Sequence, residues 1–397
     1  MRFRLTLLSA ALTGAALTPT TYAADWPAVT ISGFGTLAAT STDTDKAEFI
    51  RPNQSAGAKK DWRTGVDSNF GLQATAKATD TLSFTVQGLV RKNPVDDVGA
   101  ELAWAFAKWK ATDDLNFRVG RIGVPVYMIS DFRQVGYANT MIRPPAEVYR
   151  QVSGDYFDGA DLVWQPTFGD TTLTVQFGGG HTRQKLVGNY IEYHPVLSLH
   201  VVAENGPFTL RFGRANAKFS ITGSAALTGL GTTLRAAGLA AVADQIRISD
   251  VDGSFTSFGG TMDWKNIVLQ GEYAMRRTDT RLVMHTNSWY VMGGYRFGKV
   301  LPYYYHGNID QKSIRTMPGM PTTGPAAPLT AAVNGAIRAA IQKSNAIGVR
   351  WDFRDSMALK VQWDRIEPKE GAGAFIKPAP GFTGPVNVYA AGIDFVF

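Results

Sequence analysis

The sequence predicts an all-β protein, a transmembrane antiparallel β-barrel of about 16 strands. Three observations lead to this class. Apolar and polar residues alternate along most of the chain, short and long connections take turns between the alternating segments, and the last segment ends on the aromatic residue Phe397. Chain ends normally fray and unpaired strand edges invite aggregation, so a terminal strand of this kind needs a neighbour. A closed barrel in a bilayer supplies that neighbour and gives alternate residues lipid and water to face.

The chain begins with a short segment typical of export. Two arginines precede an apolar run over residues 5–17, and small residues then lead to Ala23. A basic start, a short apolar core and an alanine-ended cleavage site are the features of a secretory signal peptide. The run is shorter than the ~20 residues that a spanning helix needs. We therefore expect residues 1–23 to be a cleaved signal peptide and residues 24–397 to form one barrel domain.

Composition narrows the class further. The 397 residues include no cysteine, which excludes a small secreted scaffold held by disulfides. The mean hydropathy of −0.09 is compatible with a barrel, because only one residue in two faces lipid. The 41 glycines and the 11% of aromatic residues suit a twisted sheet with aromatic girdles. The net charge of +7 falls to +5 without the signal-peptide arginines Arg2 and Arg4, and this balance hints at a lumen that does not repel anions.

Alternating windows bounded by turn residues form one continuous series along the chain. They predict strands over 28–41, 65–78, 81–92, 98–111, 114–122, 158–167, 171–181, 190–204, 207–217, 253–264, 266–277, 285–297, 299–308, 344–354, 356–367 and 385–397. Several strands alternate clearly enough to assign faces. In one of them Leu359, Val361 and Trp363 share an apolar face, opposite Lys360 and Gln362. The first row is expected to face lipid and the second to face water.

Connection lengths distinguish a membrane barrel from a soluble β-sandwich. The tight connections are expected at 79–80, 112–113, 168–170, 205–206, 265, 298 and 355. The long ones are expected at 41–64, 123–157, 182–189, 218–252, 278–284, 309–343 and 368–384, with 93–97 as the shortest of this set. Outer-membrane barrels have short periplasmic turns and extended outward loops, whereas a sandwich has no reason to sort its loops in this way.

Two of the long connections carry helical patterns. Residues 224–247 and 328–342 have apolar residues at helical spacing, the second more regularly than the first. Such helices could cover a vestibule or bind a partner. The simpler interpretation, which we favour, is that they pack on the barrel mouth and keep long loops from disorder.

The connection over 123–157 combines prolines and aromatic residues with many charges, which is typical of an ordered loop. It follows a strand reading Phe-Arg-Val-Gly-Arg over 117–121, and the first strand reads Ile-Ser-Gly-Phe-Gly over 31–35. With the terminal Phe397, these features make the whole mature chain resemble the Gram-negative general porin family. One departure is the third loop, where Arg-Pro-Pro-Ala-Glu over 143–147 stands in place of the family's Pro-Glu-Phe-Gly type of turn.

The resemblance implies a fold, a location and an assembly. Members of this family are sixteen-stranded barrels that form homotrimers in the outer membrane, in contact with its lipid bilayer and lipopolysaccharide, and their third loop folds into the lumen. Acidic residues on that loop face basic residues on the wall, so that a transverse field acts on passing ions. The family's assembly machinery reads the terminal strand, here with Tyr389, Ile393, Phe395 and Phe397 on one face.

Charged residues with suitable positions form the candidate constriction. On the third loop these are Asp131, Arg133, Arg143, Glu147, Arg150 and Asp155. Inward parity selects the wall residues Lys77, Arg91, Arg118, Arg211, Arg350 and Lys360, and Arg118 is the strongest single candidate because it lies on the strand that leads into the loop. For each charge the alternative is a solvated lumen residue or a salt bridge of under ~1 kcal/mol.

The sequence offers little for other functions. The five histidines are scattered, no Ser-His pair shares an outward face, and basic and aromatic residues do not gather as nucleic-acid binding requires. We therefore expect no enzyme activity, metal, cofactor or nucleic-acid partner. The leading hypothesis is a channel for passive diffusion of small hydrophilic solutes and ions. The alternatives are a channel of the same architecture that prefers one solute class, such as anions or carboxylates, and a barrel with a structural or adhesive role.

Overall fold

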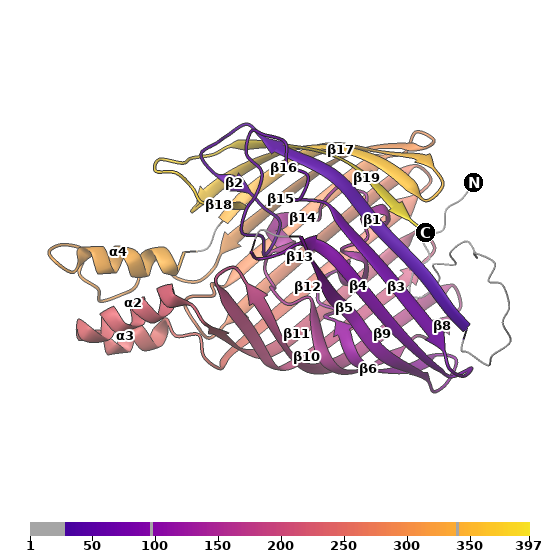
Figure 1. Cartoon of the computed structure of the whole chain (residues 1–397), viewed down its shortest axis with the longest axis horizontal. Coiled ribbons are helices and arrows are strands. Elements are labelled where there is room, and N and C mark those ends of the chain that lie inside the picture. Colours follow the sequence, from indigo (N-terminus) through magenta and orange to yellow (C-terminus); the bar gives the residue numbers. More distant parts are fainter. Residues whose placement is uncertain (1–27, 96–97, 339–340) are drawn as a thin grey trace.

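The computed structural model describes residues 28–95, 98–338 and 341–397 as a closed antiparallel barrel of 16 long strands (Figure 1). The predicted signal peptide, residues 1–23, lies outside the described residues. None of the helices found in the described ranges is long and apolar enough to cross a membrane.

The strands of the barrel wall run in chain order. They are β1 (Ala28–Thr42), β3 (Asn69–Lys77), β4 (Leu82–Lys92), β5 (Val98–Lys110), β6 (Leu115–Gly123), β7 (Tyr156–Trp164), β9 (Thr171–Leu186), β10 (Asn189–Asn205), β11 (Phe208–Thr222), β12 (Val251–Trp264), β13 (Ile267–Thr278), β14 (Thr286–Tyr295), β15 (Val300–Gln311), β16 (Ile341–Arg354), β17 (Met357–Glu370) and β19 (Val386–Val396). Each pairs with its neighbours in the chain, and β1 pairs with both β3 and β19, which closes the ring.

Shorter elements lie in the connections. Strands β2 (Glu48–Phe49) and β18 (Phe375–Ile376) lie in two connections and pair with each other as a separate small sheet. Strand β8 (Thr167–Phe168) pairs with β9. The third loop contains η1 (Ser130–Phe132), η2 (Gly136–Ala138) and α1 (Ala146–Tyr149). Helices α2 (Ala225–Ala236), α3 (Ala240–Gln245) and α4 (Ala327–Ala336) lie in two later loops.

All the predicted strands occur in the structure. Their ends lie within a few residues of the expected positions, except where a strand extends into a connection that was predicted as a long loop. The largest difference is the connection over 182–189, whose prediction as a long loop was wrong. Strands β9 and β10 continue as a hairpin, and only residues 187–188 separate them. Gly188 takes a φ of 77°, which a two-residue turn requires and glycine adopts without strain.

The assigned faces are confirmed. Val361 and Trp363 are exposed on the outer surface, while Lys360, Gln362 and Asp364 are each only 1% exposed inside the barrel. A soluble protein would cover such an apolar row, but a barrel in lipid leaves it outside. The end with short turns also carries outward aromatic pairs, including Trp109 with Phe117 and Trp351 with Phe353.

The terminal strand closes the ring at Phe397. Its backbone N–H and C=O both bond to Gly33 at 2.9 Å, and its ring stacks on Phe70 with centroids 6.4 Å apart. A side chain at Gly33 would collide with the Phe397 ring, since a Cβ there would lie 2.3 Å from its Cζ. The first and last strands are therefore fitted to each other.

The helices α2, α3 and α4 project together beyond the end with long loops (Figure 1). They form a small core of their own, with Leu234, Val333 and Ile337 fully buried and Leu282 from a neighbouring loop packed against it. The predicted helices exist, but α4 ends at Ala336 rather than at residue 342, and β16 already begins at Ile341. They pack on one another more than on the barrel mouth.

Candidate pore constriction

The third loop, residues 124–155, folds into the barrel as expected and contacts the inner wall along much of its length. Its α1 lies against β13, β14, β15 and β16, and its η2 lies against β1 and β19. Gly136 lies close to the wall, since a Cβ there would be 2.0 Å from the Asp394 carboxylate. Gly259 on the wall leaves room for Met128 in the same way. Absent side chains thus let the loop lie close to the strands.

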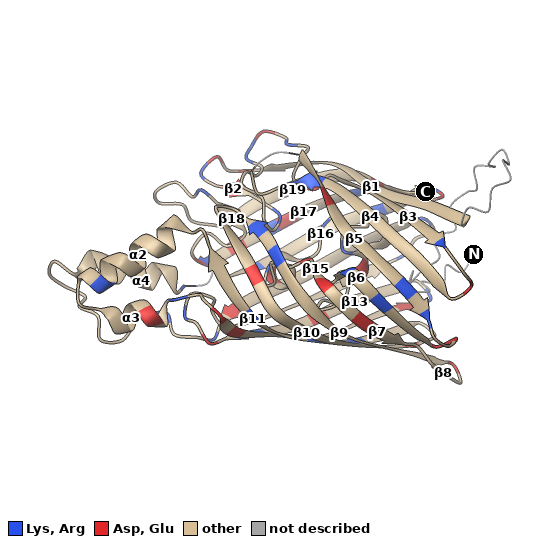
Figure 2. Cartoon of the chain, turned by 60° about the horizontal axis from the view of Figure 1, so that its bottom comes forward, with Lys and Arg blue, Asp and Glu red and all other residues tan. Residues whose placement is uncertain are grey.

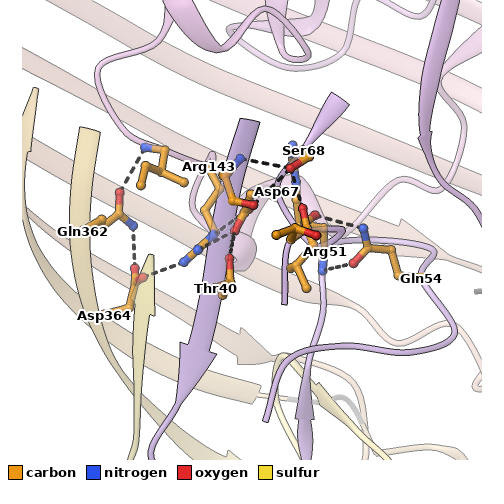
Figure 3. A network of polar contacts seen from close by, with 12 residues as sticks. Thr40, Arg51, Gln54, Asp67, Ser68, Arg143, Gln362 and Asp364 are labelled. Atoms are coloured by element: carbon orange, nitrogen blue, oxygen red, sulfur yellow. Dashed lines mark hydrogen bonds and ion pairs between the residues drawn. The ribbon is translucent and has the colours of Figure 1, made fainter. Parts of the chain in front are cut away.

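Arg143 is the centre of a polar network between loop and wall (Figure 3). Its Nε and Nη2 donate to the two Asp67 oxygens at 3.0 and 2.7 Å, and its Nη1 donates to Asp364 Oδ2 at 2.7 Å. Thr40 donates to Asp67 at 2.6 Å, and the guanidinium lies 4.9 Å from the centre of the Phe49 ring. Burial would raise the pKa of the Asp67 carboxyl, but Arg143 holds it below its ordinary value.

Two basic residues of the wall bind the backbone of the loop. Lys360 Nζ donates to the carbonyls of Gly136 and Met141 at 2.7 and 3.2 Å and forms an ion pair with Asp394 at 2.8 Å. Arg350 Nη1 donates to the Tyr137 carbonyl at 2.7 Å. Both side chains were expected to face the channel. They bind the loop instead and hold it against the wall.

The α1 segment is anchored through acidic groups. Glu147 is 1% exposed, and its Oε1 accepts hydrogen bonds from Gln342 and Ser344, each at 2.5 Å. Glu272 of β13 accepts from the Met128 N–H at 3.0 Å and from the Tyr149 hydroxyl at 2.5 Å. The expectation that Glu147 lines the constriction therefore needs correction, since its carboxylate is buried against the wall.

Arg143 and Arg150 need the same correction. Arg143 is 5% exposed and lies within the network just described, whereas Arg150 donates to the Gly373 carbonyl at 3.0 Å. Burial lowers the pKa of Arg150, with Glu147 acting in the opposite direction. These two loop arginines hold the loop in place instead of facing the passing solute.

Asp155 joins the wall to the loop at the point where the loop returns to β7. It binds Arg91 of β4 at 2.5 Å and Arg133 of the loop, and Arg91 also binds Glu101 at 2.6 Å. Burial would raise the pKa of Asp155, but the two guanidinium groups lower it below its ordinary value. Three of the predicted constriction residues are thus brought together in one cluster.

Arg51, in the loop after β2, belongs to this region and was missed from the sequence. Burial lowers its pKa to about 10, and the nearby Arg91 and Arg143 act in the same direction against the attraction of Asp67. Among the residues that the structure describes, its guanidinium has no hydrogen-bond partner. It lies within electrostatic reach of three other arginines, Arg91, Arg133 and Arg143, each of which is paired with a carboxylate.

Arg118 faces inward but is paired along the wall. Its Nε donates to Asp161 Oδ1 at 2.9 Å, a second bond joins Nη2 to Oδ2, and Gln176 donates to the same carboxylate at 2.7 Å. Residues 118 and 161 are direct cross-strand partners on β6 and β7. The loop residue that acts electrostatically on Arg118 is Asp131.

Asp131 is the exposed acidic residue of the loop. In the described part of the chain it makes no hydrogen bond or ion pair. It interacts electrostatically with three wall residues, Arg118, Arg211 and His200. Arg211 Nη1 and His200 Nε2 are buried without hydrogen-bond partners among the described residues, and Phe132 lies 6.0 Å from the Arg211 guanidinium.

This arrangement fits the expected opposition of an acidic loop and a basic wall, but at fewer positions than the sequence suggested. Lys77 is not part of it, since it lies at the far end of β3, paired with Ala28 and Ser83 beside a turn. His200, Asp161 and Glu272 were missed, although their inward parity is readable in the sequence, because only basic residues of the wall were expected to oppose an acidic loop. Figure 2 shows acidic and basic residues interspersed along the strands.

Comparison with known proteins gives the fold a context. No family model matches the chain, and no curated protein matches it in sequence. Solved structures do match. A loop L8 deletion mutant of OmpT, an outer membrane protein of Vibrio cholerae, has a TM-score of 0.56 and 14% identity over 94% of this chain and 100% of that one. The fold is that of outer-membrane porins.

Two further structures agree. An anion-selective porin from Comamonas acidovorans has a TM-score of 0.56 and 14% identity, with 93% of this chain and 99% of that chain covered. OmpF of Salmonella typhi, solved in complex with daunomycin, has a TM-score of 0.56 and 13% identity over 94% and 98% of the two chains. The porin-like barrel is therefore common to all three, while their sequences have little in common with this one.

Proposed function

We propose that this protein is an outer-membrane porin of a Gram-negative bacterium, not an enzyme, and that small hydrophilic solutes and ions diffuse through it passively. The observation that carries the proposal is a closed barrel whose third loop is fixed inside the lumen by buried ion pairs, centred on Arg143 with Asp67 and Asp364. A loop held this firmly narrows the lumen permanently, as a size-limiting filter requires.

Ion passage in this proposal depends on Asp131 and on the wall cations that it faces. Asp131 is exposed and unpaired among the described residues, while Arg118 and Arg211 lie within its electrostatic reach. A carboxylate on one side of a narrow channel and guanidinium groups on the other create a transverse field. Such a field sorts ions by sign and orients polar solutes without binding them tightly.

Single-channel recording in planar bilayers tests the proposal. Purified protein should give large steps whose current rises linearly with voltage, with weak selectivity between potassium and chloride. The absence of conductance steps from protein that has inserted would contradict it and would favour a structural or adhesive barrel. Hydrolytic activity is not expected on any lipid or peptide.

A second candidate is a channel that prefers anions or carboxylates. Arg51 lies within electrostatic reach of Arg91, Arg133 and Arg143, and its guanidinium makes no hydrogen bond among the described residues, with Asp67 as its nearby acidic group. One structural neighbour is an anion-selective porin. Small steps, a chloride-biased reversal potential and block by a small carboxylate would favour this candidate, and Arg51→Gln should then weaken the block while Lys77→Gln should not.

We also propose a homotrimer. The V. cholerae OmpT protein that resembles this chain has been solved in a trimer form, with a TM-score of 0.54. Light scattering of the detergent-solubilised protein should give three copies per particle. A monodisperse single copy would contradict this part of the proposal.

A further inference from the structure

Two histidines lie side by side on the outer surface of the barrel. His181 of β9 and His194 of β10 are both exposed, and their ring centres lie 6.2 Å apart with the ring planes at 69° to each other. Their chain neighbours Thr182 and Tyr193 pair with each other and face inward, where Thr182 is buried and Tyr193 packs against the buried Phe219. Because side chains alternate across a strand, both histidines point outward.

The long β9–β10 hairpin brings the two histidines together. Tyr193 pairs with Thr182 and Val196 pairs with Gly180, so that one residue of β9 lies opposite two residues of β10. Such an irregularity is a β-bulge, which re-aims side chains locally. The pair is hidden in the sequence, because residues 182–189 read as a loop and not as the continuation of two paired strands.

The ring nitrogens of this pair are available to a ligand. Neither His181 nor His194 makes a hydrogen bond with any residue that the structure describes. By contrast, His285 and His306 each have a ring nitrogen within hydrogen-bond reach of a neighbouring oxygen, at 2.6 and 2.8 Å. The lone pairs of the first two histidines are therefore not used by the fold itself.

The spacing of the two rings fits a metal ion held between them. Imidazole nitrogen binds Zn²⁺ at about 2.0–2.1 Å, so that two rings on one ion have their centres about 5 to 6.5 Å apart, depending on the angle at the metal. The observed 6.2 Å lies within that range. No group of three or more potential metal ligands occurs in the described parts of the chain, so water would complete the coordination.

Charges around the pair are compatible with a bound cation. Asp158 of β7 is the cross-strand partner of His181, and the two interact electrostatically. A carboxylate beside a metal-binding histidine commonly fixes the orientation of the ring and raises its basicity. The nearby cations are each balanced by a carboxylate, Arg121 by Asp158 at 2.8 Å and Arg183 by Glu192 at 3.1 Å. Neither arginine therefore leaves an uncompensated positive charge to repel an ion.

Water can reach the pair from outside the barrel. The exposed Phe177 and Leu197 lie on one side of it along the same strands, whereas the charged Arg183 and Glu192 follow on the other side. The histidines are thus at the edge of the apolar outer surface and not in its middle. A depression of about 620 Å³ in this surface has His181 in its lining and leaves room for the water ligands of an ion.

We propose that His181 and His194 bind one divalent transition metal ion on the outer surface of the barrel. Imidazole ligands suit Zn²⁺, Cu²⁺ and Ni²⁺, and of these Cu²⁺ binds most tightly to a given set of ligands. The ion joins β9 to β10 at the bulge, where the regular pairing of the two strands is interrupted. The site lies outside the lumen, so it does not depend on the proposed channel.

Calorimetric titration of the whole barrel with zinc chloride or copper(II) chloride tests the proposal, on protein purified in detergent without a histidine tag. One ion should bind per chain. Loss of an outer partner of a metal ligand already costs about 10–100-fold in affinity, so His181→Ala and His194→Ala should each weaken binding by at least about tenfold. The matched control is His306→Ala, which removes an outward histidine that packs against Trp289, and it should leave the affinity unchanged. Absence of binding, or an equal loss in the control, would overturn the proposal.

A second measurement uses the unaltered protein and does not depend on how a variant folds. The electron paramagnetic resonance spectrum of Cu²⁺ bound to the native barrel should show hyperfine splitting from two imidazole nitrogens. Splitting from one nitrogen or from none would show that the two histidines do not share an ion and would overturn the site. In variants that still form barrels, judged by heat-modifiable migration on gels, His181→Ala should reduce the splitting to that of a single nitrogen.

Discussion

Arg143 in the third loop and Asp67, which precedes β3, form a two-point ion pair that is buried inside the barrel. Nε and Nη2 of the arginine lie 3.0 and 2.7 Å from the two carboxylate oxygens. The two residues are 76 positions apart in the chain, and the pair fixes the loop to the first part of the wall. The other end of the same guanidinium reaches Asp364 of β17, so one side chain joins three distant segments.

Substitution of Arg143 should release the loop. Arg143→Ala leaves Asp67 and Asp364 as buried carboxylates without their counter-charge, and breaking a buried pair costs about 3–5 kcal/mol. We expect noisy conductance and closure at lower voltage, with the barrel still assembled. Arg235→Ala, which breaks an exposed pair with Asp244 on α2 and α3, is the control and should change neither property.

Acid should release the same loop only at low pH. The pKa values of Asp67 and Asp155 are lowered in the folded protein, so their ion pairs contribute full stability above the unfolded value of about 3.9. That contribution is lost as the pH falls through the lowered pKa values. Channel noise should therefore stay constant from neutral pH to about pH 4.5 and rise below about pH 4. A rise centred near pH 6 would show that the titration of a different group, and not of Asp67 or Asp155, releases the loop.

The sign of ion selectivity should follow the charges on the two sides of the channel. Asp131→Asn should move the zero-current potential toward chloride preference, and Arg118→Glu should move it toward potassium preference with the barrel intact. Lys77→Gln, at the far end of β3, should have a much smaller effect. If Arg118→Glu leaves the potential unchanged, its pairing with Asp161 has removed it from the conduction path.

The terminal residue should matter for assembly. Deletion of Phe397 removes two backbone hydrogen bonds to Gly33 and the ring that stacks on Phe70, so we expect slower insertion and less folded barrel in outer membranes. Phe397→Tyr keeps the ring and should assemble normally. Heat-modifiable migration on gels measures the folded fraction, and normal assembly of the truncated chain would contradict the expectation.

The strands could be predicted because their signal is local. Alternation of polar and apolar residues with a period of two is readable within each strand, as in the rows containing Val361 and Lys360, and tight turns separate the windows. The β9–β10 hairpin was misread, since the polar residues beyond His181 suggested a loop although their backbone stays paired up to the turn at 187–188. Its length depends on pairing, which the composition of one strand does not reveal.

The constriction was predictable only in part. Position in the third loop directed attention to Asp131 and Arg133, but it did not separate charges that face the channel from those that hold the loop. Arg143 and Glu147 appear equally suitable for the channel in the sequence, yet the structure buries both against β16 and β17. Their partners, Asp364 and Ser344, are more than 190 positions away.

By itself, the sequence determined that this chain is a β-barrel with about 16 strands and which side chains face outward. These properties follow from the pleat of a strand, which places each side chain by parity. Only the tertiary structure decided which of the inward charges remain unpaired. That depends on where the third loop lies against strands far away in the chain, because a buried charge is stable only beside a partner, and the packing of the loop selects which partners meet.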